Sequence, residues 1–135
     1  MKKITVLVLA LLCMVALVSC SPAYSKGSVL LKEGEVKNVS LSSLPEGYDY
    51  SYTGQDAQAI VDYLLNLDLL SDFEENPDQY GGMTWVIDLE YADGSKETIY
   101  HFGNMFIRAS GDPWYRMTNE QAHAFDSLLD ELNGH

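Results

Sequence analysis

Residues 83–102 read MTWVIDLEYADGSKETIYHF, and this segment predicts the central hairpin of a β-sheet. Apolar and polar residues alternate through its first half, which is the period of a strand with one buried face. Asp93-Gly94 is the strongest short signal for a hairpin turn. Pairing across a two-residue turn sets Trp85 against Phe102, so we expect both strands to bury one shared face.

A second turn at residues 103–104 continues the hairpin into a third strand. This pairing sets Tyr100 against Ile107 and places His101 on the outer face of the sheet, beside Phe106. Side chains alternate with a period of two, so a slip by one residue would turn the whole buried set toward water. The predicted register therefore decides which side chains are available for function.

More extended structure flanks these strands. Apolar runs at residues 29–31 and 36–41 indicate two extended segments. Residues 114–117 predict a further strand, whose register the sequence leaves open. Three tyrosines that alternate with polar residues put their rings on one face of another strand. These tyrosines are Tyr48, Tyr50 and Tyr52.

Two segments have helical periodicity. The first begins at Thr53, with Asp56 three residues later in a capping-box-like pair. Its apolar face comprises Ala57, Ile60, Val61 and Leu64. The second begins with a capping box of Thr118 and Gln121 and ends at Gly134. Its apolar face comprises Phe125, Leu128, Leu129 and Leu132. Together, the predicted strands and helices indicate an α+β domain: an antiparallel sheet of about four to six strands with two helices packed on one face.

The start of the chain has the three parts of a signal peptide. Lys2 and Lys3 form a basic start, 15 uncharged residues follow from Ile4 to Val18, and small residues precede Cys20. A helix that spans a bilayer needs about 20 residues. We therefore do not expect a retained transmembrane segment.

Residues 17–20 are Leu17-Val18-Ser19-Cys20, which resembles the lipobox of bacterial prolipoproteins. The resemblance implies that diacylglycerol is attached to Cys20, that the chain is cleaved before it, and that fatty acids such as palmitate hold the protein on the membrane. The alternatives are that Cys20 remains a thiol beside an ordinary cleavage site, or that the segment stays as an uncleaved anchor.

The resemblance divides the chain into a signal peptide (1–19), a lipidated tether (20–27) and a single globular domain (28–135). It implies an exported protein on the cell membrane, or on an outer membrane where the cell has one. Residues 82–85 and 102–106 also resemble parts of uncharacterised bacterial lipoproteins. That second resemblance carries no named family and no activity.

The charge and the cysteines limit the partners of the mature domain. Lys2 and Lys3 leave with the signal while all 20 acidic residues remain, which takes the formal net charge from −12 to −14. Nucleic acid and anionic lipid would repel such a domain. Cys13 leaves with the signal and Cys20 is committed to lipid, so no disulfide is available. We expect no nucleic-acid partner.

The sequence contains two patterns of possible metal ligands. Glu120 and His123 have the spacing at which two side chains of a helix face each other, but a closed site needs three or four converging ligands. The acidic residues between Asp68 and Asp78 lack the alternating ligands and central glycine of a calcium loop. We expect no metal and no cofactor.

His101 is the candidate for acid–base chemistry. The predicted register puts it near Asp88, Glu97 and Arg108, where a histidine and a carboxylate could act as base and acid. No nucleophile motif accompanies these residues, and the alternative is a surface network of cross-strand pairs. We therefore assign no catalytic residue.

Aromatic residues form the candidate binding surface, since rings with polar tips make effective contacts with proteins or sugars. Phe106 comes first, because on the outer face it would lie in an exposed apolar patch. The alternative is that the rings build the core. The full set of candidates is Phe106, His101, Arg108, Tyr48, Tyr50 and Tyr52.

Taken together, these features favour a membrane-anchored surface lipoprotein. Its small domain would bind or modulate another envelope component, such as an envelope protein, without catalysis. The alternative function is a small envelope hydrolase that uses His101 with a neighbouring carboxylate.

Overall fold

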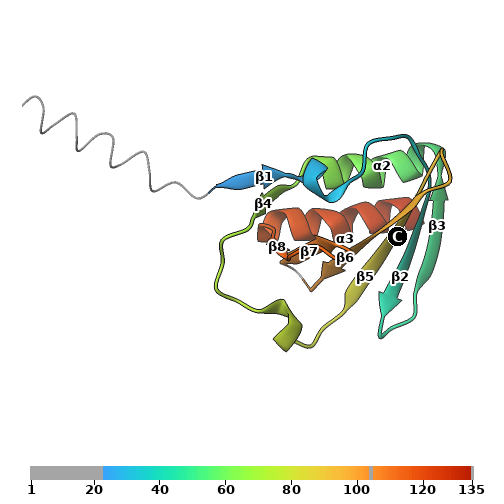
Figure 1. The fold of residues 1–135 in the computed structure, drawn as a ribbon. Coiled ribbons are helices and arrows are strands. Elements are labelled where there is room, and N and C mark those ends of the chain that lie inside the picture. The colour runs from blue at the N-terminus through green and yellow to red at the C-terminus, as the bar shows by residue number, and fades with distance from the viewer. Residues whose placement is uncertain (1–22, 104, 135) are drawn as a thin grey trace, which may run out of the picture.

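A computed structural model describes residues 23–103 and 105–134 of the chain (Figure 1). The predicted signal peptide and Cys20 lie outside these residues. Within them, an antiparallel β-sheet packs against α-helices, which confirms the α+β class.

Eight strands make up the sheet in the described part of the chain. In chain order they are β1 (Tyr24–Lys26), β2 (Val36–Leu44), β3 (Asp49–Thr53), β4 (Asp68–Leu70), β5 (Thr84–Tyr91), β6 (Lys96–Phe102), β7 (Phe106–Ala109) and β8 (Tyr115–Arg116). The helices are α2 (Gly54–Leu65) and α3 (Asn119–Asn133). Two short 3-10 turns are η1 (Gly27–Leu30) and η2 (Pro77–Gln79).

The strands lie in the order β1-β4-β8-β7-β6-β5-β2-β3, and neighbouring strands are antiparallel. Among the described residues the sheet thus has more strands than the four to six expected. Strands β1, β4 and β8 have only two or three residues each, too few for a period of two to be recognised. None of the described helices is long and apolar enough to cross a membrane.

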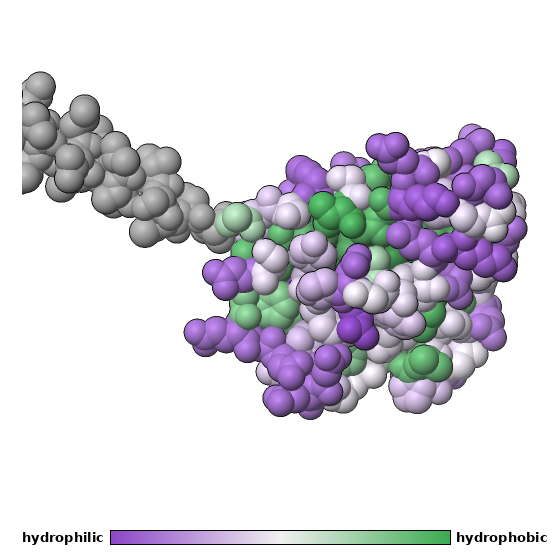
Figure 2. Space-filling view, in the orientation of Figure 1, coloured by the Kyte–Doolittle hydropathy of each residue, from purple (hydrophilic) through white to green (hydrophobic). Residues whose placement is uncertain are grey.

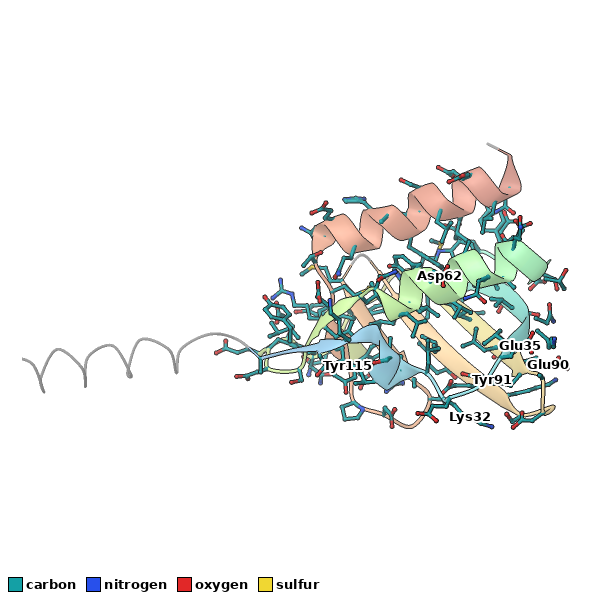
Figure 3. All side chains as sticks on the ribbon, turned by 90° about the horizontal axis from the view of Figure 1, so that it is seen from above. Lys32, Glu35, Asp62, Glu90, Tyr91 and Tyr115 are labelled. Atoms are coloured by element: carbon teal, nitrogen blue, oxygen red, sulfur yellow. The ribbon has the colours of Figure 1, made fainter. Side chains whose placement is uncertain are left out.

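Both helices cover the same face of the sheet, as Figures 1 and 3 show from two directions. Leu64 of α2 and Phe125 of α3 are fully buried there against strand residues such as Ile87. The expected layer of helices on one face is therefore confirmed. We call the helix-covered side of the sheet the inner face and the opposite side the outer face.

The two helices begin in different ways. Thr118 Oγ1 accepts a hydrogen bond from Gln121 N at 3.2 Å, which confirms the predicted cap of α3. Gly134 ends α3 with a left-handed φ of 73°, as expected for a C-terminal glycine. Thr53 precedes α2, but its side chain makes no capping bond. The capping-box-like pair with Asp56 was therefore a wrong prediction.

The β5–β6 hairpin has a three-residue turn, so its predicted register was wrong by one residue. Tyr91 N donates to Ser95 O at 2.9 Å, and Gly94 has a left-handed φ of 84°. This is the pattern of a three-residue turn with a bulge. Trp85 consequently pairs with His101, one residue short of its predicted partner.

The same shift continues into β7, where Tyr100 pairs with Arg108. His101 therefore points into the core, and its predicted position on the outer face was wrong. The sequence allowed either register because β6 has apolar side chains on both faces. Ile99 points inward, whereas Tyr100 and Phe102 point outward.

The chain before β2 differs from the expected extended structure, because residues 29–30 lie in the 3-10 turn η1. Gly27 N donates to Leu67 O at 2.9 Å, and a Cβ on Gly27 would lie 1.6 Å from Leu64 O. Only glycine fits this close approach. Residues 24–26, expected in the tether, instead form β1 and pair with β4.

Candidate functional site

The outer face of the sheet carries a second apolar layer. Residues 71–83, between β4 and β5, contribute Phe73, whose ring centre lies 5.6 Å from that of Phe106. Tyr80 from the same segment stacks on Phe106 at 6.4 Å and 12°. Phe106 is consequently only 7% exposed, so the expectation of an exposed apolar patch at Phe106 was wrong. The reason is that a loop covers this face.

A pocket of about 280 Å³ opens between this loop and the outer face, and we call it the aromatic pocket. Leu44 and Tyr80, two of its lining residues, are 57% and 54% exposed. The cavity therefore belongs to the surface. Its lining comprises Leu44, Pro77, Asp78, Tyr80, Thr84, Tyr100, Phe102, Arg108 and Trp114.

Arg108 supplies the positive charge of the aromatic pocket. Its guanidinium carbon lies 4.4 Å from the ring centre of Trp114 and 5.6 Å from that of Tyr100, so both ring faces attract the cation. Its Nε is buried and has no hydrogen-bond partner among residues 23–103 and 105–134. The rings hold the guanidinium in place, while one buried donor is left without an acceptor.

Polar contacts hold the wall of the aromatic pocket in position. Trp114 Nε1 donates to Asp78 Oδ1 at 3.0 Å, and Asn76 Oδ1 caps η2 by accepting from Asp78 N at 3.2 Å. Arg116 of β8 forms an ion pair with Glu75 at 3.0 Å. The loop is thus attached at two points to residues 114–116, and two of its acidic residues, Asp78 and Glu75, make these attachments.

His101 lies in the core, with 2% of its surface exposed. Its ring stacks on Phe125 at 4.5 Å and 24°, and its Nε2 is 3.2 Å from Tyr63 Oη. Tyr63 Oη donates to Gln121 O at 2.9 Å. The same hydroxyl also lies 3.8 Å from Met117 Sδ, so it connects the His101 ring to two further residues. Burial lowers the pKa of His101 to about 4, because the charged form is poorly solvated there.

The charged residues expected beside His101 lie elsewhere. Asp88 is exposed on the outer face, and Arg108 lines the aromatic pocket. Glu97 accepts from Tyr91 Oη at 2.7 Å. The structure does not bring together the acid and base that the alternative function, a hydrolase, would require.

Tyr48, Tyr50 and Tyr52 share the inner face beside the β3 edge, as expected, and we call them the tyrosine ladder. Their neighbouring ring centres lie 6.4 and 6.3 Å apart. Exposure falls from 50% at Tyr48 to 6% at Tyr52. Tyr52 Oη donates to Asn133 Oδ1 at 2.9 Å, and burial raises the pKa of this phenol. Only the Tyr48 end of the ladder is fully open to a partner.

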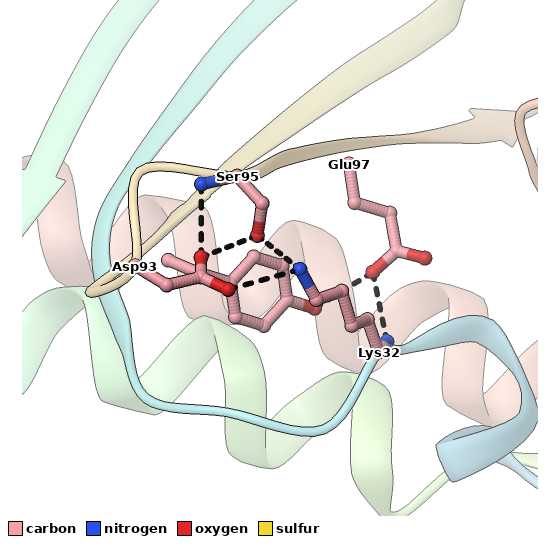
Figure 4. Close-up of polar contacts among 5 residues, drawn as sticks. Lys32, Asp93, Ser95 and Glu97 are labelled. Carbon is pink, nitrogen blue, oxygen red and sulfur yellow. Dashed lines mark hydrogen bonds and ion pairs between the residues drawn. The ribbon is translucent and has the colours of Figure 1, made fainter.

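A polar cluster that the sequence did not predict joins the chain before β2 to the β5–β6 hairpin (Figure 4). Lys32 Nζ lies 3.2 Å from Asp93 Oδ2 and also contacts Ser95 Oγ. Lys32 N donates to Glu97 Oε2 at 3.0 Å. Hydrogen bonds from Ser95 and Lys32 lower the pKa of Asp93 to about 2. The groups satisfy one another, so the cluster is a structural link.

The two residues that have the spacing of metal ligands on one helix do not form part of a metal site. Glu120 and His123 are both exposed on α3, and no group of three or more His, Cys, Asp or Glu residues that could hold a metal occurs in the described part of the chain.

The sequence analysis named Arg108 as a candidate binding residue. It did not name Tyr80, Tyr100 or Phe102, which line the aromatic pocket together with Arg108. One signal was present: two aromatic residues, Phe73 and Tyr80, interrupt an otherwise polar loop. Rings in such a loop need an apolar surface to cover, which points to a second layer on the sheet.

Compared with known proteins, the chain matches no family model, no curated protein and no solved structure.

Proposed function

We propose that this chain is an exported lipoprotein, held on the membrane through Cys20, whose domain binds another envelope protein without catalysing a reaction. The lipobox-like sequence of residues 17–20 supports the anchor. The aromatic pocket supports the binding role.

The observation that carries the binding role is the setting of Arg108. Its guanidinium stacks on Trp114, and its buried Nε has no acceptor within the described residues. Arginine and aromatic side chains contribute most of the free energy at binding interfaces. A ligand that enters the aromatic pocket would bury apolar area against the rings and accept a hydrogen bond from the guanidinium of Arg108, which lines the pocket.

The chemistry of the partner follows from the lining. The rings of Tyr80, Tyr100 and Phe102 suit an apolar side chain, and Arg108 suits a carbonyl or carboxylate oxygen next to it. A segment of a partner protein supplies both groups together. We therefore expect a protein that inserts one apolar side chain and places an acceptor beside it.

Photo-crosslinking in intact cells tests this proposal. A photoreactive residue at Leu44, 57% exposed on the pocket, should capture a defined partner. Val29, 47% exposed and not part of the pocket lining, is the matched position. Arg108→Met keeps the apolar stem of the side chain but removes the donors, and it should abolish the adduct at position 44. Identical adducts at both positions, or none at position 44 in cells rich in the protein, would contradict the proposal.

No observation favours the hydrolase alternative. It required His101 in a cleft, and His101 is instead enclosed between Phe125 and Tyr63.

A further inference from the structure

Strand β1 is the first described element of the chain, and it forms one edge of the sheet. It is held by pairing with β4 and by an ion pair between Lys26 and Asp68 at 2.6 Å. Gly27 N adds a hydrogen bond to Leu67 O at 2.9 Å. The chain therefore enters the fold at a defined place.

The distance from this place to the predicted lipid is short. Three residues separate Cys20 from Tyr24, and at full extension the four residue steps reach about 14 Å. A lipid on Cys20 would consequently keep the β1 edge within about 14 Å of the head groups.

The surface beside β1 is suited to a membrane interface. Tyr24 is 56% exposed, and tyrosine is enriched where apolar lipid meets water. A shallow pocket of about 260 Å³ adjoins it and is lined by Tyr24, Leu70, Met105, Arg116, Met117, Thr118 and Asn119. Figure 2 shows apolar surface close to the point where the chain enters the domain.

The charges of this edge favour neutral head groups. Lys26 and Arg116 are both engaged by carboxylates of the domain, Asp68 and Glu75. Each pairing partly neutralises its cation, and the acidic domain as a whole would be repelled by anionic lipid.

We propose that the β1 edge, with Tyr24 and the pocket beside it, rests on the zwitterionic head groups of the bilayer. This inference rests on the lipid anchor of the proposed function. Strand β3 lies at the opposite edge of the eight-stranded sheet, about 34 Å away at about 4.8 Å per strand spacing. The sheet then stands upright, and the tyrosine ladder faces away from the membrane.

Spin-label accessibility on vesicles tests the orientation. The full chain is expressed with its own signal, purified from membranes and reconstituted in phosphatidylcholine vesicles. With Cys20 acylated and Cys13 removed, an introduced cysteine is the only free thiol. A nitroxide is attached at Asn119→Cys beside the pocket or, as the matched control, at Asp49→Cys on β3. Collision with a water-soluble nickel chelate then measures how far each label is shielded.

We expect the label at position 119 to be several-fold less accessible than the label at position 49. Adding Tyr24→Ser should narrow that difference while the protein still floats with the vesicles. Equal accessibility of the two labels on floating protein would overturn the orientation and leave the anchor standing. Protein that does not float and carries a reactive Cys20 would overturn both.

Discussion

His101 Nε2 lies 3.2 Å from Tyr63 Oη, and this contact joins the sheet to the helices. Tyr63 belongs to α2 and donates to Gln121 O of α3 at 2.9 Å, while Phe125 of α3 stacks on the His101 ring. Three elements thus meet at one polar contact inside an apolar core. The histidine that the sequence analysis placed on the outer face of the sheet instead contacts both helices beneath the inner face.

The buried His101 predicts a loss of stability in acid. Its pKa is about 4 in the folded protein against 6.5 for a free side chain, so protons bind the unfolded chain more tightly. The stabilisation from a neutral His101 is complete above pH 6.5 and is lost as pH falls toward 4. The difference between the folded and the free pKa of His101 corresponds to a loss of about 3 kcal/mol in the free energy of unfolding at low pH.

Urea unfolding between pH 6.5 and 4 measures the free energy of unfolding of the wild-type chain and of His101→Phe. The wild type should lose more stability over this range than the variant. His123→Ala removes an exposed histidine and is the matched control. If His101→Phe loses stability with falling pH as steeply as the wild type, His101 is not the titrating group.

Gly27→Ala should destabilise the fold by about 3 kcal/mol, because the new Cβ would lie 1.6 Å from the backbone oxygen of Leu64. The strain should also release β1, so trypsin should cut at Lys26 faster. Gly81→Ala meets nothing within 4 Å and should change stability by less than about 0.5 kcal/mol. Equal stability of the two variants in urea would disprove the close approach at Gly27.

Phe73→Ala should loosen the loop over the outer face. The ring of Phe73 packs on Phe106, and its removal should cost roughly 2 kcal/mol, since Phe73 is only partly buried. Hydrogen exchange should rise in residues 71–83 and in β7. Asp72→Ala changes an exposed neighbour and should leave exchange as it is. Unchanged exchange in Phe73→Ala would mean that the loop is held by its polar contacts alone.

Cys20→Ser tests the anchor directly. If Cys20 accepts the lipid, the variant should accumulate as a larger, uncleaved precursor, and labelled palmitate should appear only on the wild-type protein. Immunoblotting and autoradiography of the same cells provide both measurements. A variant that is still cut to the mature size would point to an ordinary signal cleavage site.

The helices and the positions of the main strands could be predicted because their signals are local. The apolar face of α3 repeats at helical spacing, and Thr118 caps its start. The register of β6 could not be predicted, because a bulged turn at Gly94 and a two-residue turn fit the same Asp-Gly sequence. Only the packing of Ile99 and His101 under the helices distinguishes the two registers.

The candidate site was predicted in part for a similar reason. Arg108 was named as a neighbour of His101 in the predicted register, and the structure places it in the aromatic pocket instead. Tyr80, from the loop of residues 71–83, lines the same pocket. Phe106 was expected at the surface because the aromatic residues of this loop indicate a covering layer but not which strand they cover. Contacts between residues distant in the chain leave no periodic pattern in the sequence.

By itself, the sequence determined the α+β class, the two amphipathic helices and the position of the central hairpin, because each follows from short-range periodicity and turn chemistry. The tertiary structure alone decided that His101 is enclosed and that Arg108 lines an aromatic pocket. Both faces of β6 carry apolar side chains, so the sequence is compatible with either register. The register that forms is the one in which the helices bury Ile99 and His101.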